Sequence, residues 1–351
     1  MISRQLNSAQ PYKPLDFGNG LLTGSVTSDG RLLSLSTYHP KQGYVVLGAI
    51  APLSDDQRYN QAAVRAYRAT LAQPDAPTFG LRTSLSVITP RVYLLEEAVP
   101  QSRWHLDTLQ LQVTTWAPHL DGQPVPGVLQ QWQLSNPSDQ TLGWDYWWAG
   151  QMGLSRASYT QLTERGHLPL PESQVSLTFD GRELYIVAPN VEAAAVVLGL
   201  PAGSPWHQHG HGPLPIEIQG YLTIPPGQTI ELTLIFALGQ TIEQARQVVA
   251  ILTSLNPQQS LVATLKVRQV CWQALNSRLS EPIRSSVIVH RAQTYILDCC
   301  ILPVEEGTCL LTDHQLLPLS WTRDAYFLLQ GLDWEADSVT LPLTRRHLIW
   351  L

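Results

Sequence analysis

The sequence contains few charges, few sulphur-containing residues and no long apolar run. Charged residues make up 14% of its 351 positions, and 22 Lys and Arg against 28 Asp and Glu give a net charge of −6. The basic residues form no stripe, whereas nucleic-acid-binding proteins cluster Lys and Arg against phosphates. We therefore expect no nucleic acid partner.

Neither an export signal nor a membrane helix is recognisable in the sequence. Residues 1–14 are polar and contain no apolar core of the kind found in signal peptides. No uninterrupted apolar span reaches the roughly 20 residues that cross a bilayer. The sequence therefore predicts a protein without a membrane partner, and a cytoplasmic location is the default expectation.

The few cysteines exclude a disulfide framework and a zinc cluster. Cys271, Cys299, Cys300 and Cys309 all lie in the last third, without the paired spacing of zinc ligands. The adjacent Cys299 and Cys300 favour free, buried thiols on a helix. The sequence also contains no nucleophile elbow, phosphate-binding loop or dinucleotide fingerprint. The Gly-Asn-Gly sequence at 18–20 is too short to count as a glycine-rich fingerprint. We expect neither a metal nor a cofactor.

The first two thirds of the sequence predict β-structure. Asp29-Gly30 between two alternating runs is typical of a hairpin, and short apolar runs recur as far as residue 237. Strands are expected at 21–26, 31–35, 81–88, 91–96, 109–116, 127–134, 142–149, 175–179, 183–188, 193–198, 216–224 and 230–237. Many short strands separated by turns indicate a large antiparallel β-sandwich, with a helix at 55–72 lying on it.

Near residue 240 the apolar period changes from two to 3.6, which predicts a domain boundary. Helices are expected at 241–255, at 258–279 and from 282 to about 302, followed by a loop at 303–322. The expected domains are a β-sandwich at 1–240, a helical linker at 241–281 and a second helical region at 282–351. The fold class is thus β followed by α.

Three histidines in the sandwich are candidate metal ligands. His207, His209 and His211 occupy alternate positions and would share one side of an extended chain. The flanking Gly and Pro residues favour a polar surface loop instead.

A second cluster, Trp-Asp-Tyr-Trp-Trp at 144–148, is a candidate aromatic platform for a sugar. Alternation would send Trp144, Tyr146 and Trp148 to one face and Trp147 to the other. At least part of this cluster is therefore expected in the core.

The segment 317–327 combines a proline-containing stretch with the start of a helix expected at about 324–332. Pro318 disfavours helix for the residue before it, so the polar pair Arg323-Asp324 falls near the first helical turn. The helix dipole would stabilise the Asp324 carboxylate, and the Arg323 guanidinium can bind this carboxylate or a hydroxyl-rich ligand. Trp321 offers an apolar face to a sugar ring. A capped helix with a salt bridge and a core tryptophan is the alternative.

The pattern Trp-x-Arg-Asp-Ala-x-Phe at 321–327 resembles the segment that opens the catalytic barrel of glucoamylase-like glycoside hydrolases, family 15 and its six-hairpin (α/α)6 relatives. The strand pair around Pro225-Pro226-Gly227, followed by a helix, is similar to the end of the galactose-mutarotase-like super-sandwich that precedes this barrel. The resemblance implies that residues 282–351 form the first helices of an incomplete (α/α)6 barrel. It also implies that Trp321, Arg323 and Asp324 bind the terminal glucose.

The resemblance places the catalytic groups outside this sequence. Only 27 residues follow Asp324 (351 minus 324), whereas a twelve-helix barrel requires on the order of 160 to 240. We therefore expect the front part of a longer protein. An inverting mechanism needs an acid and a base on opposite sides of the scissile bond, and Glu305, Glu306 and Asp313 match neither. No catalytic residue is assigned.

The expected function is hydrolysis of terminal α-glucosidic bonds in α-glucans or malto-oligosaccharides, with a second polypeptide completing the barrel. This chain alone is expected to be inactive. Two alternatives stay open at this point: a fragment of a glycogen-debranching-type glucosidase, which has a similar domain order, and a non-catalytic carbohydrate-binding β-sandwich protein.

Overall fold

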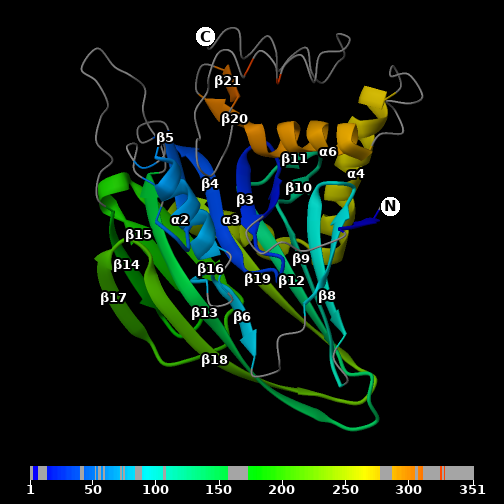
Figure 1. Cartoon of the computed structure of the whole chain (residues 1–351). Coiled ribbons are helices and arrows are strands. Elements are labelled where there is room, and N and C mark those ends of the chain that lie inside the picture. Colours follow the sequence, from blue (N-terminus) through cyan, green and yellow to red (C-terminus); the bar gives the residue numbers. More distant parts are fainter. Residues whose placement is uncertain are drawn as a thin grey trace.

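The computed structural model describes residues 3–6, 14–39, 43–51, 53, 57, 60–71, 73, 76–83, 89–105, 108–156, 173–276, 287–304, 307–310, 325 and 328. Two large antiparallel sheets make up most of this part of the chain (Figure 1). The described helices follow them in sequence. The predicted antiparallel β-sandwich followed by helices is therefore confirmed.

The larger sheet has ten strands in the order β1-β7-β8-β9-β12-β19-β16-β15-β14-β17. Their bounds are β1 Ser3–Gln5, β7 Arg91–Leu95, β8 Val99–His105, β9 Gln110–Trp116, β12 Gly127–Ser135, β14 Gln174–Phe179, β15 Leu184–Ala188, β16 Ala193–Leu198, β17 Trp206–His211 and β19 Thr229–Gly239. A short 3-10 helix, η1 (Pro189–Val191), connects β15 to β16.

The second sheet has seven strands in the order β18-β13-β5-β4-β3-β2, with β6 also pairing with β13. Their bounds are β2 Leu15–Gly18, β3 Leu22–Val26, β4 Leu32–His39, β5 Gly43–Gly48, β6 Gly80–Thr83, β13 Leu142–Arg156 and β18 Leu214–Ile224. A small ribbon, β10 (His119–Leu120) with β11 (Gln123–Pro124), stands apart from both sheets.

An aromatic cluster fills the space between the two sheets. The Trp148 ring lies 5.9 Å from Trp132 and 6.4 Å from Phe79, centroid to centroid, and all three side chains are at most 2% exposed. Trp144 and Tyr146 stack at 5.2 Å in the same core. Alternation along β13 thus sends these residues inward, as predicted for part of this cluster, and they do not form an exposed sugar platform.

The helices pack against the sandwich after β19. α3 (Ile242–Ser254) begins at Thr241, whose side chain accepts a hydrogen bond from the Gln244 backbone, and it covers the outer side of β19, β16 and β12. α4 (Pro257–Asn276) and α6 (Val287–Tyr295) lie at one end of the sandwich (Figure 1). None of the described helices is long and apolar enough to cross a membrane.

Most predicted strands agree with the structure to within two residues at each end. The predicted helix at 55–72 is α2 (Gln61–Leu71), which starts after Asn60, the acceptor of a 2.9 Å hydrogen bond from the Ala62 backbone. The hairpin at Asp29-Gly30 is also confirmed, as the turn between β3 and β4.

Three sequence predictions about local structure are wrong. The segment at 206–211 is not a loop but the edge strand β17, which pairs with β14 from Gln174 to Phe179. The helix predicted to reach about 302 ends earlier, in a π-helical turn, η2 (Ile296–Cys300). The chain then extends into a hairpin, β20 (Ile301–Val304) and β21 (Gly307–Leu310), where a loop was expected.

Candidate functional site

The predicted sugar-binding residues Trp321, Arg323 and Asp324 lie outside the described residues, as do Glu305, Glu306 and Asp313. Ala325, which follows Asp324 in the sequence, is described. It is helical, as predicted, and 1% exposed. It belongs to an apolar cluster with Ile296, Leu297, Cys300, Ile301 and Leu310. Ala325 therefore packs against η2 and the hairpin β20–β21.

The end of β2 and the turn after it pack directly against η2. The backbone of Gly20 donates a 3.1 Å hydrogen bond to the carbonyl oxygen of Asp298, in the middle of η2. A Cβ atom at Gly18 would lie 2.2 Å from the same oxygen, so only glycine permits this approach. Asn19 holds the turn from the other side, because its amide donates to the carbonyls of Pro118 and Val125 at 3.1 and 2.9 Å. The Gly-Asn-Gly sequence is thus a packing element.

A buried ion pair joins η2 to α4. The Arg268 guanidinium lies 2.5 Å from the Asp298 carboxylate, with side-chain exposures of 7% and 2%. Burial raises the pKa of Asp298 to about 6, although Arg268 and Arg291 oppose the shift. The same Nη2 atom of Arg268 lies 3.3 Å from Nε2 of the His119 ring. Burial, and then the charge of Arg268, lower the pKa of His119 to about 4, so this imidazole is neutral at pH 7.

The turn between β7 and β8 contributes two buried carboxylates. Glu96 and Glu97 both have positive φ angles, 48° and 55°, and both are 1% exposed. Arg4 binds Glu97 with two hydrogen bonds of 2.7 and 2.6 Å, and Gln269 of α4 donates to Glu96 at 2.7 Å. A tight turn with charged residues in left-handed geometry is held in place by these partners.

α6 closes this group of residues. Arg291 donates to the backbone carbonyl of Glu97 and, at 3.4 Å, to that of Asp16. The His290 ring stacks on Trp272 of α4 with 3.9 Å between centroids, and burial lowers its pKa. We call the set Asp298, Arg268, His119, Glu96, Glu97, Arg291 and His290 the junction cluster.

The junction cluster can position chain segments but is enclosed by protein. None of its carboxylates and imidazoles is more than 5% exposed, and each carboxylate contacts an Arg or Gln side chain. Charges buried in this way are stable only with such partners. The cluster therefore fixes α4, α6 and η2 on the sandwich, next to the apolar cluster that holds Ala325.

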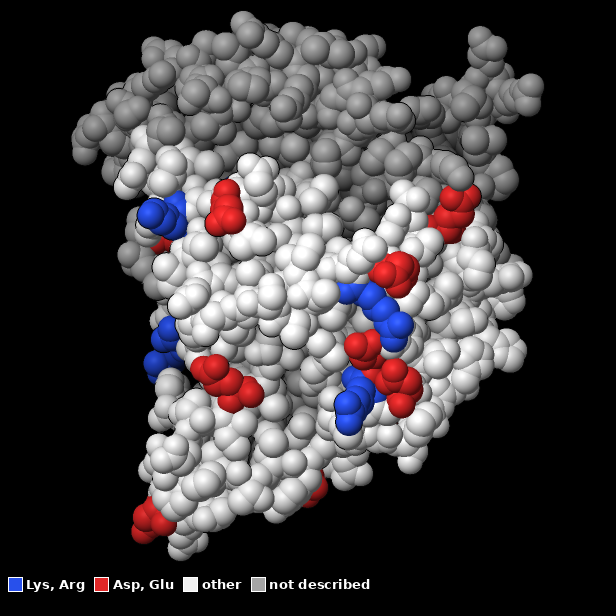
Figure 2. Space-filling model, turned by 180° about the vertical axis from the view of Figure 1, so that it is seen from behind, with Lys and Arg blue, Asp and Glu red and all other residues white. Residues whose placement is uncertain are grey.

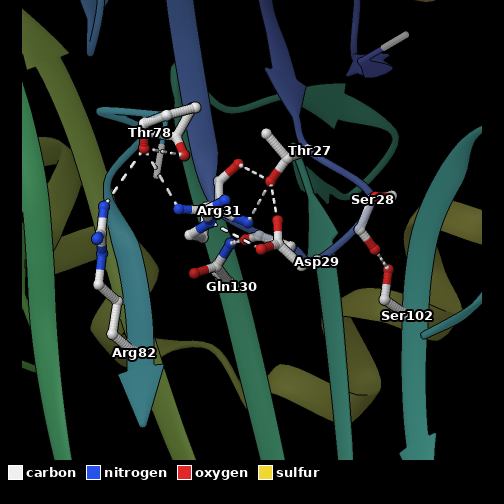
Figure 3. A network of polar contacts seen from close by, with 10 residues as sticks. Thr27, Ser28, Asp29, Arg31, Thr78, Arg82, Ser102 and Gln130 are labelled. Carbon is white, nitrogen blue, oxygen red and sulfur yellow. Dashed lines mark hydrogen bonds and ion pairs between the residues drawn. The ribbon is translucent and has the colours of Figure 1, made fainter. Parts of the chain in front are cut away.

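A second polar network lies around the β3–β4 turn (Figure 3). Arg31 forms a 2.8 Å ion pair with Asp29 and donates a 3.3 Å hydrogen bond to the carbonyl of Ala76. Arg82 donates to this same carbonyl at 3.3 Å. Gln130 of the opposite sheet donates to Gly30 at 2.8 Å. The network thus ties the turn to the larger sheet and to the segment that precedes β6.

The histidines of β17 point outward as a row, in agreement with the alternation. His207, His209 and His211 are all exposed, and His207 shares a 2.8 Å hydrogen bond with Thr178 of β14. The described residues contain no group of His, Cys, Asp or Glu arranged to hold a metal. Cys299 and Cys300 are buried thiols that form no disulfide with described residues, as predicted, and burial raises the pKa of Cys299 well above its usual value.

The described surface carries little charge of one sign. On the face seen in Figure 2, acidic and basic side chains stand in small mixed groups on a mainly uncharged surface. Among the described ion pairs, Arg246 lies 3.4 Å from Glu183 and above the ring of Tyr185. This distribution suits an uncharged, polar ligand better than a polyanion.

The sequence did not indicate the junction cluster. Asp298 and His119 are 179 positions apart (298 minus 119) and come together only through the fold. The one local signal was the Gly-Asn-Gly turn at 18–20, whose glycines mark the close approach of η2.

No model of a known protein family matches the sequence, and no curated protein matches it. Among solved structures, a bacterial glucoamylase complexed with acarbose aligns with a TM-score of 0.48 and 6% identity, over 93% of this chain and 48% of its own. A chain named as a kojibiose phosphorylase from the human microbiome aligns with a TM-score of 0.47 and 9% identity, over 84% and 40%. A galactose mutarotase-like protein from Lactobacillus casei aligns with a TM-score of 0.33 and 8% identity, over 65% and 100%. This chain spans less than half the length of the first two proteins.

Proposed function

We propose that this chain is the N-terminal part of a glucoamylase-like glycoside hydrolase that acts on the ends of α-glucans or malto-oligosaccharides. The observation that carries the proposal is the Trp-x-Arg-Asp motif at 321–324, standing after a β-sandwich and the helices α3, α4 and α6. This is the order of parts that the motif requires in the family it resembles.

In this proposal the chain supplies a glucose-binding corner. The planar fork of Arg323 donates to neighbouring sugar hydroxyls, Asp324 accepts from them, and Trp321 covers the apolar face of the ring. The junction cluster supports this corner indirectly, because it anchors η2 and the apolar cluster that contains Ala325.

Cleavage by an inverting mechanism needs a protonated carboxyl group to assist the leaving oxygen and an ionised one to activate water. We assign neither role to a residue of this chain. The later helices of the complete barrel would provide them. Purified chain is accordingly expected to release no glucose from maltose, and robust turnover would place the acid and base within these 351 residues.

The binding proposal is tested by calorimetric titration with maltotriose. Replacing Arg323 by Ala removes a charge-assisted hydrogen bond and is expected to weaken binding by about 1.5 to 3 kcal/mol. Arg65→Ala, at an exposed position of α2, is the matched control and should bind as the unaltered protein does. Equal affinity in the Arg323 and Arg65 variants would reduce the motif to a helix cap with a salt bridge.

The linkage that the complete enzyme cleaves is a separate question. A glycogen-debranching-type glucosidase has a similar order of parts, and a panel of α-1,4- and α-1,6-linked oligosaccharides in the same titration would distinguish the two. Preference for an α-1,6-linked end would favour the debranching alternative.

The other alternative is a non-catalytic protein in which the β-sandwich binds the carbohydrate. In that case maltotriose should bind with the same affinity whether or not Arg323 is replaced.

A further inference from the structure

A cleft of about 490 Å³ opens where the edge of one sheet meets the other, far in sequence from the motif at 321–324. Small-molecule sites typically have volumes of about 300 to 1,000 Å³. The polar and aromatic residues of its lining are Arg82, Gln151, Trp206, Gln208 and Glu217, which come from β6, β13, β17 and β18.

The backbone around this cleft is held firmly. Gly150 in β13 has a φ of +144°, and a Cβ there would lie 2.4 Å from the carbonyl oxygen of Thr78, so the segment before β6 crosses β13 in close contact. Gln151, the next residue, donates a 2.9 Å backbone hydrogen bond to Pro77, which also lines the cleft. The glycine therefore serves this crossing.

The polar network around the β3–β4 turn also holds the segment that precedes β6. Figure 3 shows the side chains of Arg31, Thr78 and Arg82 converging on one carbonyl, that of Ala76, at 3.3 to 3.4 Å. The contact orients the Arg82 guanidinium at the wall of the cleft. Rigid placement of polar groups lowers the entropic cost of binding.

The lining has the chemistry that carbohydrates require. The Trp206 ring packs at a tilt of 37° against the buried Phe179 ring, with 6.0 Å between centroids, and it remains partly exposed at the cleft. An aromatic ring of this kind packs against the C–H face of a sugar. Gln151 and Gln208 offer both donors and acceptors, Arg82 offers donors and Glu217 offers acceptors.

The charges of the lining exclude other ligand classes. Arg82 and Glu217 are of opposite sign, so the cleft has no excess positive charge for a phosphate and no paired carboxylates for a cation. A lipid chain would offer no hydrogen bonds to Gln151, Gln208 and Glu217 of the lining. An uncharged, hydroxyl-rich molecule remains.

We propose that this cleft binds a short α-glucan, so that the sandwich itself carries a carbohydrate-binding site separate from the motif at 321–324. The choice of glucan rests on the proposed function. In the complete enzyme such a site would hold a polysaccharide chain on the protein while its end occupies the glucose-binding corner.

Calorimetric titration with maltotriose tests the site in the Arg323→Ala background, in which binding at the motif is weakened. Glu217 is exposed, so Glu217→Ala should fold normally, and we expect about tenfold weaker residual binding from the loss of a charge-assisted hydrogen bond. Gln219→Ala is the matched control, because Gln219 is the next outward-facing residue of β18 and lies outside the lining. Trp206→Phe, which keeps an aromatic ring beside Phe179, should also weaken binding.

The outcomes separate the two proposals. Weaker binding in the Glu217 and Trp206 variants, with Gln219→Ala unchanged, supports the cleft whatever Arg323→Ala does by itself. If the Glu217 and Trp206 variants bind as their background does while Arg323→Ala alone weakens binding, the cleft is overturned and the proposed function stands. Failure of the unaltered protein to bind maltotriose also overturns the cleft as a glucan site, and glucose release by a completed enzyme then decides the proposed function.

Discussion

At the scale of single residues, the junction cluster contains two buried groups whose pKa values shift in opposite directions. Burial favours the neutral form of both side chains, which raises the pKa of the Asp298 carboxyl to about 6 and lowers that of the His119 imidazole to about 4. Arg268 lies between them and contacts both. The two shifts make opposite contributions to the pH dependence of folding.

We predict that Asp298→Asn makes the protein more stable as pH rises from about 4 to 6.5. Over this window unfolded His119 binds a proton that folded His119 does not, so the free energy of unfolding increases with pH, by up to about 1.4 kcal/mol per pH unit. In the unaltered protein the opposite slope of Asp298, whose folded form holds the extra proton between pH 3.8 and about 6, largely cancels this rise. Urea unfolding at a series of pH values measures the slope.

The reciprocal variant, His119→Gln, serves as the control. It removes the opposing contribution of His119, so the free energy of unfolding should fall more, or rise less, from about pH 4 to 6 than in the unaltered protein, while the contribution of His290 is the same in both. Arg268, Arg291, Glu96 and Glu97 also contribute charge near these groups and stay in place in both variants. Identical pH profiles in the two variants would contradict the burial of these groups at the junction.

Gly18 offers a test of the packing of η2 against the end of β2. We predict that Gly18→Ala destabilises the protein by about 1 to 3 kcal/mol, because its Cβ would meet two backbone oxygens, of Asp298 and Leu22, at 2.2 and 2.9 Å. At Gly143 the added Cβ would meet only the hydroxyl group of the Tyr221 side chain, which is 62% exposed and can move. Thermal unfolding of both variants gives the comparison, and equal losses would show that the approach of η2 to β2 is not rigid.

At the scale of elements, alternating or continuous apolar runs predicted the strands, and the prediction failed where a strand has neither. β16, with a nearly continuous apolar sequence, was predicted exactly to its bounds at 193–198. β17 carries histidines on its outer side and Gly210 on its inner side, where a Cβ would crowd Leu214, so it reads as a loop. β13 was expected to end at 149 but continues past Gly150 to Arg156, because Gly150 permits the close crossing of the segment at Thr78.

The end of α6 illustrates a limit of a different kind. Residues 296–302 are apolar enough to continue a helix, and the sequence therefore predicts a helix as far as about 302. The structure instead widens the last turn into η2, which brings the Asp298 carboxylate to Arg268 and its carbonyl to Gly20. Both partners lie far away in the sequence, so local periodicity carries no trace of them. The fold class could be predicted from local patterns. The junction cluster could not, because its contacts join residues that are far apart in the sequence.

The docking of α3 gives an element-scale prediction. Leu252 is 1% exposed and lies directly over Gly127 of β12, where an added Cβ would be 2.6 Å from its Cδ1 atom. Leu252→Ala should cost about 2 to 5 kcal/mol in chemical denaturation, through lost burial and the cavity left behind. Its neighbour Ile251 is 41% exposed, and Ile251→Ala should cost only about 0.5 kcal/mol. Similar losses in both variants would mean that α3 is not held through this face.

At the scale of the whole molecule, the question is how firmly the helices after β19 are joined to the sandwich. The expected domains at 1–240, 241–281 and 282–351 remain a prediction. The junction cluster nevertheless crosses both of their boundaries, since His119 comes from the first, Arg268 from the second and Asp298 from the third. A glucose-binding corner that depends on η2 would inherit its rigidity from these contacts.

We predict that Arg268→Ala loosens α6 and η2 from the sandwich. The substitution leaves the Asp298 carboxyl buried without its ion-pair partner, which typically costs about 3 to 5 kcal/mol. Hydrogen exchange should then be accelerated most at the amides of α6 and η2, and least in β12 and β19 at the centre of the larger sheet. Arg246→Ala, which removes an ion pair with Glu183 whose side chains are 52% and 24% exposed, should change exchange little. Acceleration spread evenly over all strands and helices would instead mean that the sandwich and these helices open as one unit, and that Arg268 supports the whole fold rather than this junction.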